Sequence, residues 1–164
     1  MDLYLTTKRC LITRPQLRDR PFLNQLFCNE KTRAFLGGRQ SQNAIERRCS
    51  KVISQSQCDH GIVRLQEGDR AVGLLSVGPY HDTLSYEVSY EFLPEYWGKG
   101  YAYEALQAFL PFSCQALKLP VILAETQHRN TRSKRLLDKI GLQQVDQLKR
   151  FGEQQVIYQY RSPV

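Results

Sequence analysis

Apolar and polar residues alternate most regularly over residues 84–92, where nine consecutive positions follow a strict two-residue period. The apolar positions are Leu84, Tyr86, Val88, Tyr90 and Phe92, and the polar positions are Ser85, Glu87, Ser89 and Glu91. Successive side chains of a strand point to opposite faces of the sheet. The pattern therefore predicts a strand with one apolar and one polar face.

Shorter apolar runs predict further strands. They cover residues 9–14, 61–66, 71–77, 121–126, 143–149 and 154–160. Residues 67–70, which include a glycine, and Gly152 are typical of hairpin turns between neighbouring strands.

Apolar residues at helical spacing predict helices over 19–29, 41–57, 102–117 and 130–140, the second of them with a weak pattern. Asp19 and Asn130 are the predicted N-caps, and Gly141 ends the last helix. Pro111 is expected to kink the helix over 102–117. An antiparallel meander followed by strand–helix–strand–helix predicts an α+β (mixed α/β) fold, which we expect to form a single domain over residues 1–164.

The 164 residues carry 23 Lys and Arg against 16 Asp and Glu, a formal net charge of +7. This excess suits an anionic partner such as a phosphorylated cofactor, an acidic surface or nucleic acid. No apolar run approaches the roughly 18 residues of a membrane span, and residues 1–9 lack a signal-peptide core. We expect a soluble, cytoplasmic protein without a membrane partner, as a monomer or a homodimer.

Five cysteines are scattered along the chain without a C-x-x-C pair, and the three histidines lie far apart in sequence. Disulfide frameworks and zinc sites need closer, paired spacing. We therefore expect free thiols, as in a reducing compartment, and no metal site.

The segment with the clearest chemistry is residues 94–102, P-E-Y-W-G-K-G-Y-A, between the alternating strand and the long helix. Gly98 and Gly100 let the backbone approach a ligand closely. The unpaired N–H groups where the helix begins favour phosphate oxygens, and Lys99 adds a positive charge. The pattern is neither G-x-G-x-x-G nor G-x-x-x-x-G-K-[ST], which argues against a dinucleotide-binding fold and a Walker loop.

Several motifs, in this order, resemble the GNAT superfamily of acetyl-CoA-dependent N-acetyltransferases. Residues 97–102 match its pyrophosphate loop, Q/R-x-x-G-x-G/A, except at the first position, where Trp97 stands. The segment T-K-R-C-L-I-T-R-P at 7–15 is similar to the T-x-R-L-x-L-R-P start of the Rim-type branch, which acetylates ribosomal-protein N-termini. E-V-S-Y at 87–90 resembles its E-I-G-Y strand. N-T-R-S at 130–133 with K-I-G-L at 139–142 resembles its N-x-x-S…K-x-G-F segment.

The resemblance implies a central, mixed but mostly antiparallel, twisted sheet flanked by helices and splayed between the fourth and fifth predicted strands. It also implies acetyl-CoA as cosubstrate, with the pantetheine arm in that opening and the pyrophosphate on the N–H groups of residues 98–102. The implied cofactor-binding residues are Phe92, Leu93, Trp97, Gly98, Lys99, Gly100, Tyr101, Ala102, Asn130, Ser133 and Arg135. Lys134 is an alternative to Arg135 at the outer phosphates. Asn130 also fits a plain helix cap, and the two cations also fit a solvated helix face.

Attack by an amine needs a group that takes its proton, and a carboxylate or a water that it orders suits this role. Glu87, on the polar face of the alternating strand, is the first candidate, and Glu125 is the second; each also fits a paired surface carboxylate. Many GNAT enzymes carry a tyrosine general acid after the N-x-x-S motif, where this sequence has Leu137. The donor to the leaving thiolate is therefore open between Ser133, another tyrosine and water.

The pKa of the acceptor amine determines how easily it loses a proton, and this distinguishes the candidate acceptors. A protein α-amine has a pKa of about 7.7–8.0 and a lysine about 10.4, so an α-amine loses its proton at much lower cost near neutrality. We therefore hypothesise a protein N-terminal α-amine, with a small-molecule amine as the alternative.

Two other functions compete with this hypothesis, a basic RNA- or ribosome-associated binding protein and a GNAT-like domain that holds CoA without catalysis. The basic residues are spread along the chain and the aromatic residues follow strand and helix spacing. Both features argue against nucleic acid as the partner, while ribosome proximity stays compatible with the charge.

Overall fold

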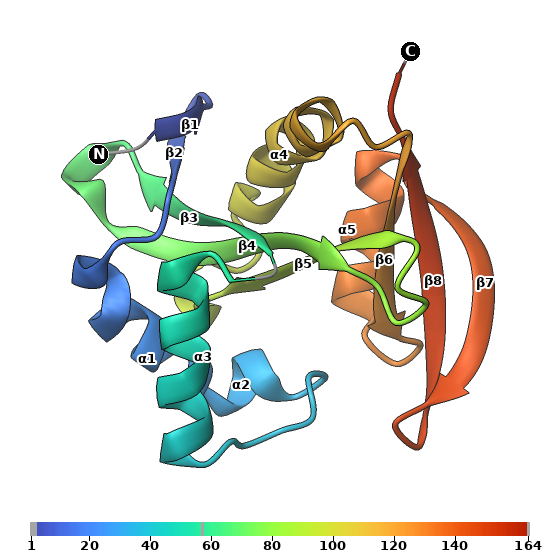
Figure 1. Ribbon diagram of the computed structural model, residues 1–164, viewed down its shortest axis with the longest axis horizontal. Helices are drawn as coiled ribbons and strands as arrows, with labels where there is room; N and C mark the ends of the chain where they lie inside the picture. The colour runs from blue at the N-terminus through green and yellow to red at the C-terminus, as the bar shows by residue number, and fades with distance from the viewer. Residues whose placement is uncertain (1–2, 57, 164) are drawn as a thin grey trace.

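The computed structural model describes residues 3–56 and 58–163 (Figure 1). Its strands are β1 (Leu3–Thr6), β2 (Cys10–Thr13), β3 (Asp59–Leu65), β4 (Ala71–Pro79), β5 (Tyr86–Phe92), β6 (Val121–Gln127), β7 (Gln143–Arg150) and β8 (Glu153–Arg161). Its α-helices are α1 (Arg20–Cys28), α2 (Glu30–Arg33), α3 (Gln42–Ser54), α4 (Tyr101–Leu117) and α5 (Thr131–Ile140). Three 3₁₀ turns are η1 (Leu17–Asp19), η2 (Glu67–Asp69) and η3 (Pro94–Tyr96).

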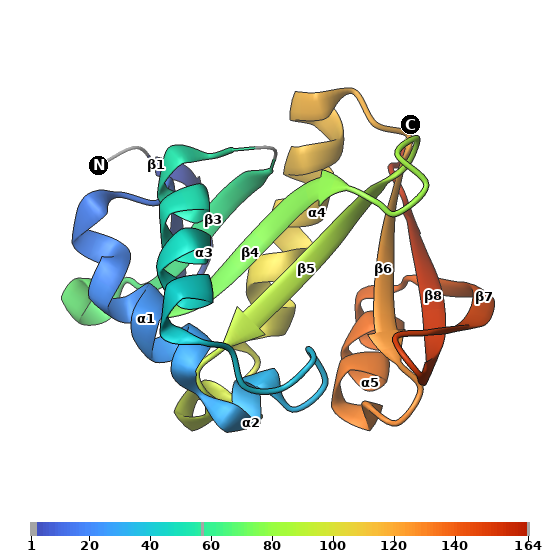
Figure 2. The same ribbon diagram turned by 60° about the horizontal axis from the view of Figure 1, so that its bottom comes forward.

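The strands form one sheet in the order β1-β2-β3-β4-β5-β6-β8-β7. Neighbouring strands run antiparallel except β5 and β6, which are parallel and share a single paired position, Glu87 with Leu123. Past this position the two strands diverge, as Figure 2 shows. The predicted mixed, mostly antiparallel sheet is confirmed, and so is its splay, because β5 and β6 are the fourth and fifth predicted strands.

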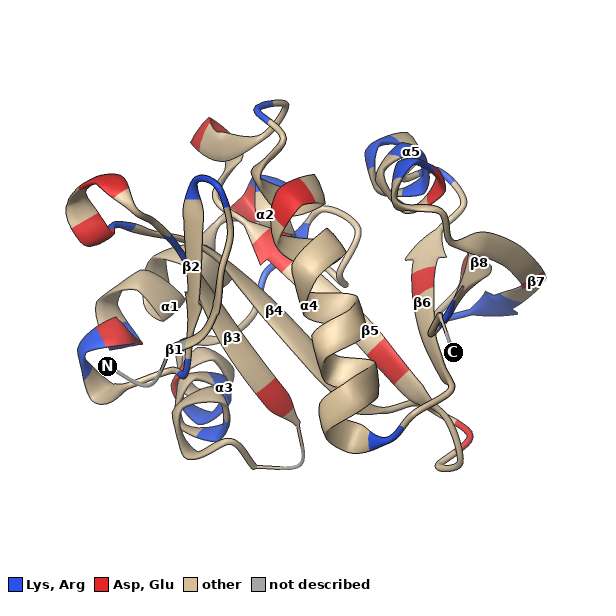
Figure 3. Cartoon of the chain, turned by 90° about the horizontal axis from the view of Figure 1, so that it is seen from above, with Lys and Arg blue, Asp and Glu red and all other residues tan. Residues whose placement is uncertain are grey.

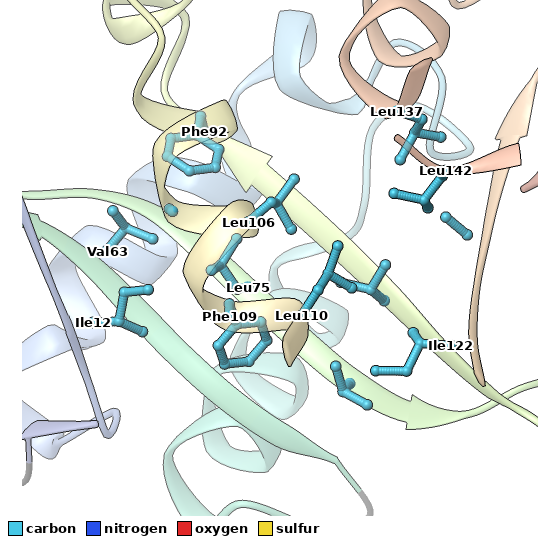
Figure 4. Packing of buried hydrophobic residues seen from close by; sticks show 14 of the residues in the cluster. Ile12, Val63, Leu75, Phe92, Leu106, Phe109, Leu110, Ile122, Leu137 and Leu142 are labelled. Atoms are coloured by element: carbon cyan, nitrogen blue, oxygen red, sulfur yellow. The ribbon is translucent and has the colours of Figure 1, made fainter. Parts of the chain in front are cut away.

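Helices cover both faces of the sheet. α4 packs on one face, where Phe109 is buried against Leu75 of β4. α1 and α3 pack on the other face, where Phe27 is buried in a cluster with Leu74. Leu74 and Leu75 thus contribute to opposite faces, as the two-residue period of a strand requires. Figure 4 shows the α4 side of the core, with Ile12, Val63, Leu75, Phe92, Leu106, Phe109, Leu110, Ile122, Leu137 and Leu142 labelled.

The predicted caps have different outcomes. The Asn130 side chain accepts a hydrogen bond from the Ser133 N–H (3.2 Å), and Gly141 ends α5 with φ +98°, so both ends of that helix are confirmed. Asp19 stands at the N-cap position of α1, but its side chain makes no cap bond. Its buried carboxylate instead accepts from the Gln16 N–H (2.8 Å) and pairs with the buried Arg64. A buried arginine needs such a charge partner, and this pairing takes the place of the cap bond.

Some boundaries differ from the predicted ones. β1 is too short to show a pattern in the sequence, and β2 stabilises it by pairing. β5 begins at Tyr86 rather than at residue 84, because the Asp82 carboxylate accepts from the N–H groups of Leu84 and Ser85 and forms a turn. α4 continues past Pro111, and the kink expected there stays a prediction. Residue 57, the predicted end of the helix over 41–57, lies outside the described residues.

No helix in the ranges 3–56 and 58–163 is long and apolar enough to cross a bilayer.

Candidate active site

A cavity of about 580 Å³ lies where β5 and β6 diverge. Its walls come from residues 88–92 of β5, residues 125 and 126 of β6, the segment 31–36 around α2, and the first turns of α4 and α5. A second cavity of about 240 Å³ lies next to it and shares Phe92, Trp97, Ala102, Arg132 and Leu136 with it. The two cavities are thus adjacent, and their walls extend from the strand opening to the start of α4.

The edge of β5 that faces this space offers backbone hydrogen bonds. β5 pairs with β4 along its whole length but with β6 only at Glu87. Polar backbone groups that point away from β4 beyond that position therefore face the opening, where the amides of a pantetheine arm would pair with them. The Phe92 carbonyl is already engaged, since it accepts from the Trp97 Nε1–H (2.8 Å). The Leu93 N–H points toward β4 instead and donates to the Val72 carbonyl (3.0 Å). Leu93 itself is buried in the cluster under α1 and α3.

The glycine loop has the geometry of an anion site. Gly98 and Gly100 have φ of +71° and +82°, the left-handed region that side chains rarely adopt. Gly100 is the N-cap of α4 and supplies no side chain to cap the first-turn N–H groups. A Cβ on Gly98 would meet no described atom within 4 Å, so there is open space beside the backbone. The loop therefore fits a diphosphate held by N–H groups at the positive end of the helix dipole.

The N-terminal strands hold this loop in place. Arg9 donates to the Lys99 carbonyl (2.9 Å) and pairs with Glu104 in the first turn of α4 (2.7 Å). The Thr7 hydroxyl donates to the same carboxylate (2.6 Å), and the Arg9 guanidinium lies 4.4 Å from the Tyr101 ring centre. The T-K-R motif at residues 7–9 thus acts on the loop from 90 residues away in sequence.

Cations at the cavities differ from those expected. Arg132 borders both cavities and stacks on Trp97 at 3.8 Å, and Lys139 borders the second cavity. Arg135 is exposed and borders neither, and the same holds for the predicted Lys99. Sequence reasoning missed Arg132 and Lys139, although their seven-residue separation places them on one face of a helix. Figure 3 shows how Lys and Arg residues gather along α5.

Glu87 lies at the closed end of the opening, half-buried, and is not part of the lining of the larger cavity. Burial, followed by the charge of Glu125, raises the pKa of its carboxyl to about 7, against the opposing charge of Arg150. A carboxyl with a pKa near neutrality is suited to take and release a proton.

The other acidic groups are held by ion pairs. Glu125 lines the larger cavity and accepts from the Tyr80 hydroxyl (2.6 Å) and from Arg150 Nε (3.0 Å). Burial and the Glu125 carboxylate raise the pKa of Tyr80. Glu91, on the same strand face as Glu87, lines the cavity but is buried in a two-pronged pair with Arg48. Both carboxylates thus have their oxygens engaged, which leaves Glu87 as the less restrained acid.

Ser133 and Asn130 border the larger cavity, as expected for residues near a pantetheine arm. The Ser133 hydroxyl hydrogen-bonds the Tyr90 hydroxyl, which sequence reasoning did not single out. Burial raises the pKa of Tyr90 to about 12, against the opposing effect of Ser133, so its hydroxyl stays protonated at neutral pH. Tyr90 was hidden because it belongs to the apolar set of an alternating strand. Leu137, at the position of the usual tyrosine, is a core residue.

Comparison with known proteins adds a family match. The model of the acetyltransferase (GNAT) domain matches residues 9–143. The uncharacterized N-acetyltransferase YnaD of Bacillus subtilis is 27% identical over 154 residues, covering 85% of this chain and 82% of that protein.

Two solved structures share the fold. A GNAT-family acetyltransferase from Bacillus anthracis has a TM-score of 0.83 at 24% identity, covering 96% of this chain and 97% of that one. The Salmonella typhimurium acetyl transferase that modifies the N-terminal serine of ribosomal protein L7/L12 has a TM-score of 0.83 at 13% identity, covering 99% of this chain and 100% of that one.

Proposed function

The chain belongs to the GNAT acetyltransferase family and is an acetyl-CoA-dependent acyltransferase; from this premise we propose that it transfers the acetyl group to a primary amine of low pKa by direct attack in a ternary complex. The observation that carries the proposal is the pair of adjacent cavities between the uncapped start of α4 and the opening between β5 and β6. They bring the glycine loop next to a strand edge that suits the pantetheine amides, and Glu87, whose pKa is raised to about 7, lies next to the lining residue Val88.

Acetyl-CoA supplies an acetyl group activated as a thioester. First-turn N–H groups of α4 and the Arg132 guanidinium would bind its phosphates, and the Asn130 and Ser133 side chains would border its arm. In the proposed cofactor set we keep Phe92, Leu93, Trp97, Gly98, Gly100, Tyr101 and Ala102 from the sequence, and add Arg132 and Lys139. Lys99 and Arg135 stay sequence-based candidates for the outer phosphates, since both are exposed and border neither cavity.

Protons move at both ends of the reaction. As the amine nitrogen bonds to the acetyl carbon, the C–S bond breaks; the nitrogen must lose a proton and the sulfur gains one. Glu87 would take the amine proton through an ordered water, because it lies just beyond the cavity lining and titrates near neutrality. Tyr90, kept protonated by burial and hydrogen-bonded to Ser133, would give a proton to the sulfur. Glu125 would act on Glu87 through its charge, which makes it a positioning residue in this scheme.

The proposed acceptor is a protein N-terminal α-amine, which needs no strong base near neutral pH. The Salmonella typhimurium structural neighbour modifies an N-terminal serine, which supports this choice. A cavity of about 580 Å³ that also takes the acetyl group and part of the arm has room for a chain end rather than for a folded surface. All five cysteines are free thiols, which supports action in a reducing compartment such as the cytoplasm.

The test is acetyl-CoA binding followed by thiol release. We expect acetyl-CoA to raise the melting temperature, and a peptide with a free N-terminus to release CoA faster than the same peptide with a blocked N-terminus and a free lysine. Absence of a shift at millimolar acetyl-CoA contradicts the family-based function. Equal rates with the two peptides contradict the α-amine acceptor alone.

A further inference from the structure

Arg33, the last residue of α2, is a buried cation on the wall of the larger cavity. Arg33 is 8% exposed and is among the residues that line the cavity. Its Nε donates to the Gly38 carbonyl (3.0 Å) and its Nη2 to the Leu36 carbonyl. Within the part of the chain that the structure describes, no carboxylate forms an ion pair with this guanidinium.

Such a charge is unfavourable without an anion. Backbone carbonyls satisfy two of the five N–H groups of the guanidinium but do not neutralise its charge. Burial, followed by the nearby charge of Arg48, lowers the pKa of Arg33, and the charge of Glu91 opposes this shift without cancelling it. Arginine keeps its proton even so, and a ligand carboxylate beside it would offset the desolvation that the protein compensates only in part.

The acidic side chains on the cavity wall are already paired and would bind an additional ammonium group of an acceptor only weakly. Both oxygens of Glu91 are taken by Arg48, which is itself stacked on Phe27 at 3.9 Å. Both oxygens of Glu125 are taken by Tyr80 and Arg150. The exposed Lys31 adds another positive charge to the α2 side of the wall. An acceptor with several ammonium groups would therefore meet net positive charge and engaged carboxylates.

The position of Arg33 separates it from the phosphates of acetyl-CoA. α2 lies on the side of the sheet covered by α1 and α3, whereas α4 and its glycine loop lie on the opposite side (Figure 1). The segment after α2 is tied across the opening, since Gln127 Nε2 of β6 donates to the Phe35 carbonyl (3.3 Å). An anion beside Arg33 would thus belong to the molecule that enters from the α2 side.

Building on the proposed function, we infer that the acceptor amine carries a carboxylate within a few bonds and that Arg33 binds this carboxylate. An amine with a carboxylate close to it occurs in a peptide whose first residues include Asp or Glu, and in a free amino acid. Arg33 is then a specificity-determining residue for the acceptor, and polyamines are poor acceptors for this chain.

The experiment compares matched acceptors by thiol release at saturating acetyl-CoA. One pair is a peptide with Glu as its second residue and the same peptide with Gln there; another is free glutamate and glutamine; spermidine is the fifth acceptor. We expect kcat/KM to be about tenfold higher for the acidic member of at least one pair, through a lower KM, and lower for spermidine. The pair that shows the preference identifies the source of the carboxylate.

Variants assign the preference to Arg33. Arg33→Gln is expected to reduce the preference to about twofold or less by raising KM for the acidic acceptor, with the thermal shift by acetyl-CoA unchanged. Arg33→Met is the second variant without the charge, used if the Gln variant does not fold, and is expected to lose the preference in the same way. Arg39→Gln removes an exposed cation from the same segment, which pairs with Glu30 (3.6 Å), and should keep the wild-type preference.

Equal kcat/KM for acidic and neutral acceptors in the wild type overturns the inference, and so does a preference that survives in Arg33→Gln. Either result leaves the proposed function standing as long as CoA is released from acetyl-CoA in the presence of an amine. Failure of every acceptor to release CoA contradicts the proposed function instead.

Discussion

The hydroxyl of Tyr90 on β5 and the hydroxyl of Ser133 in the first turn of α5 share a hydrogen bond across the opening between the diverging strands. The two residues are 43 positions apart in sequence, and both border the larger cavity. Since burial keeps Tyr90 protonated, the pair presents an O–H donor where a departing sulfur would need one.

Tyr90→Phe should lower kcat by about tenfold to a hundredfold, because it removes the proposed proton donor, while a thiolate is a tolerable leaving group without one. Ser133→Ala should have a smaller effect, and the double variant should lose little more than Tyr90→Phe, as expected for two groups that act as one unit. Steady-state thiol release measures all three. Tyr4→Phe is the control. Tyr4 lies on β1, outside both cavities, and its hydroxyl accepts hydrogen bonds from Arg14 and Gln55. Fully additive losses contradict the shared role.

Glu87 should set the acidic limb of the pH profile. A general base must be ionised, and burial with the Glu125 charge raises its pKa to about 7. We expect kcat/KM to rise about a hundredfold per pH unit below about pH 7, because Glu87 and the acceptor amine both lose a proton there, and about tenfold per unit from there to the amine pKa of about 8. Glu87→Gln should lower the plateau by about a hundredfold and remove this limb, leaving only titration of the acceptor amine. An unchanged pH profile in Glu87→Gln assigns the base to another group.

The same pKa shift predicts a stability effect of the opposite sign. The folded-state pKa of Glu87, about 7, lies above its ordinary value of 4.5, so the folded protein binds more protons than the unfolded chain between these values. Its contribution to stability is present below about pH 4.5 and is lost as the pH rises through 7. The free energy of unfolding of Glu87→Gln, measured relative to the wild type, should therefore rise by about 3 kcal/mol between pH 4.5 and pH 8. Denaturant unfolding at the two pH values measures this, and a constant difference contradicts it.

Structural features that depend on a few neighbouring residues could be predicted from the sequence. The alternation over residues 84–92 predicts β5, and the glycines of the loop lie where φ is positive. The N-cap of α5 was likewise evident, because Asn130 bonds an N–H only three residues away. Each of these features depends on local backbone geometry, which local residue types determine.

The partners of the charged groups could not be predicted, because tertiary packing decides them. Glu87 and Glu91 look equivalent on the polar face of one strand, yet α3 brings Arg48 to Glu91 and leaves Glu87 with a raised pKa. Arg33 looks like a surface residue in a polar segment, and only the fold of residues 34–38 around its guanidinium buries it.

Gly100→Val should weaken acetyl-CoA binding by at least tenfold. A β-branched side chain at φ +82° strains the backbone by about 1–3 kcal/mol. Its Cβ would also lie 3.2 Å from Nη2 of Arg9, whose Nη1 holds the loop through the Lys99 carbonyl. Gly152→Val is the matched control, because Gly152 has φ +73° in the β7–β8 turn, away from both cavities. Both variants should lose similar stability, but only Gly100→Val should lose affinity in calorimetric titration. Equal affinities argue against the glycine loop as the phosphate site.

Arg132 and Arg135 distinguish the phosphate site proposed from the cavities from the one expected from the sequence. Arg132 borders both cavities and stacks on Trp97, whereas Arg135 is exposed and borders neither. We therefore expect Arg132→Gln to raise the Kd of acetyl-CoA by about five- to tenfold and Arg135→Gln by less than about twofold, at low salt, where partly exposed charges are least screened. The loss from Arg132→Gln should shrink as salt is added. A larger loss from Arg135→Gln would place the outer phosphates on the exposed face of α5, in agreement with the sequence-based prediction and against the cavity-based one.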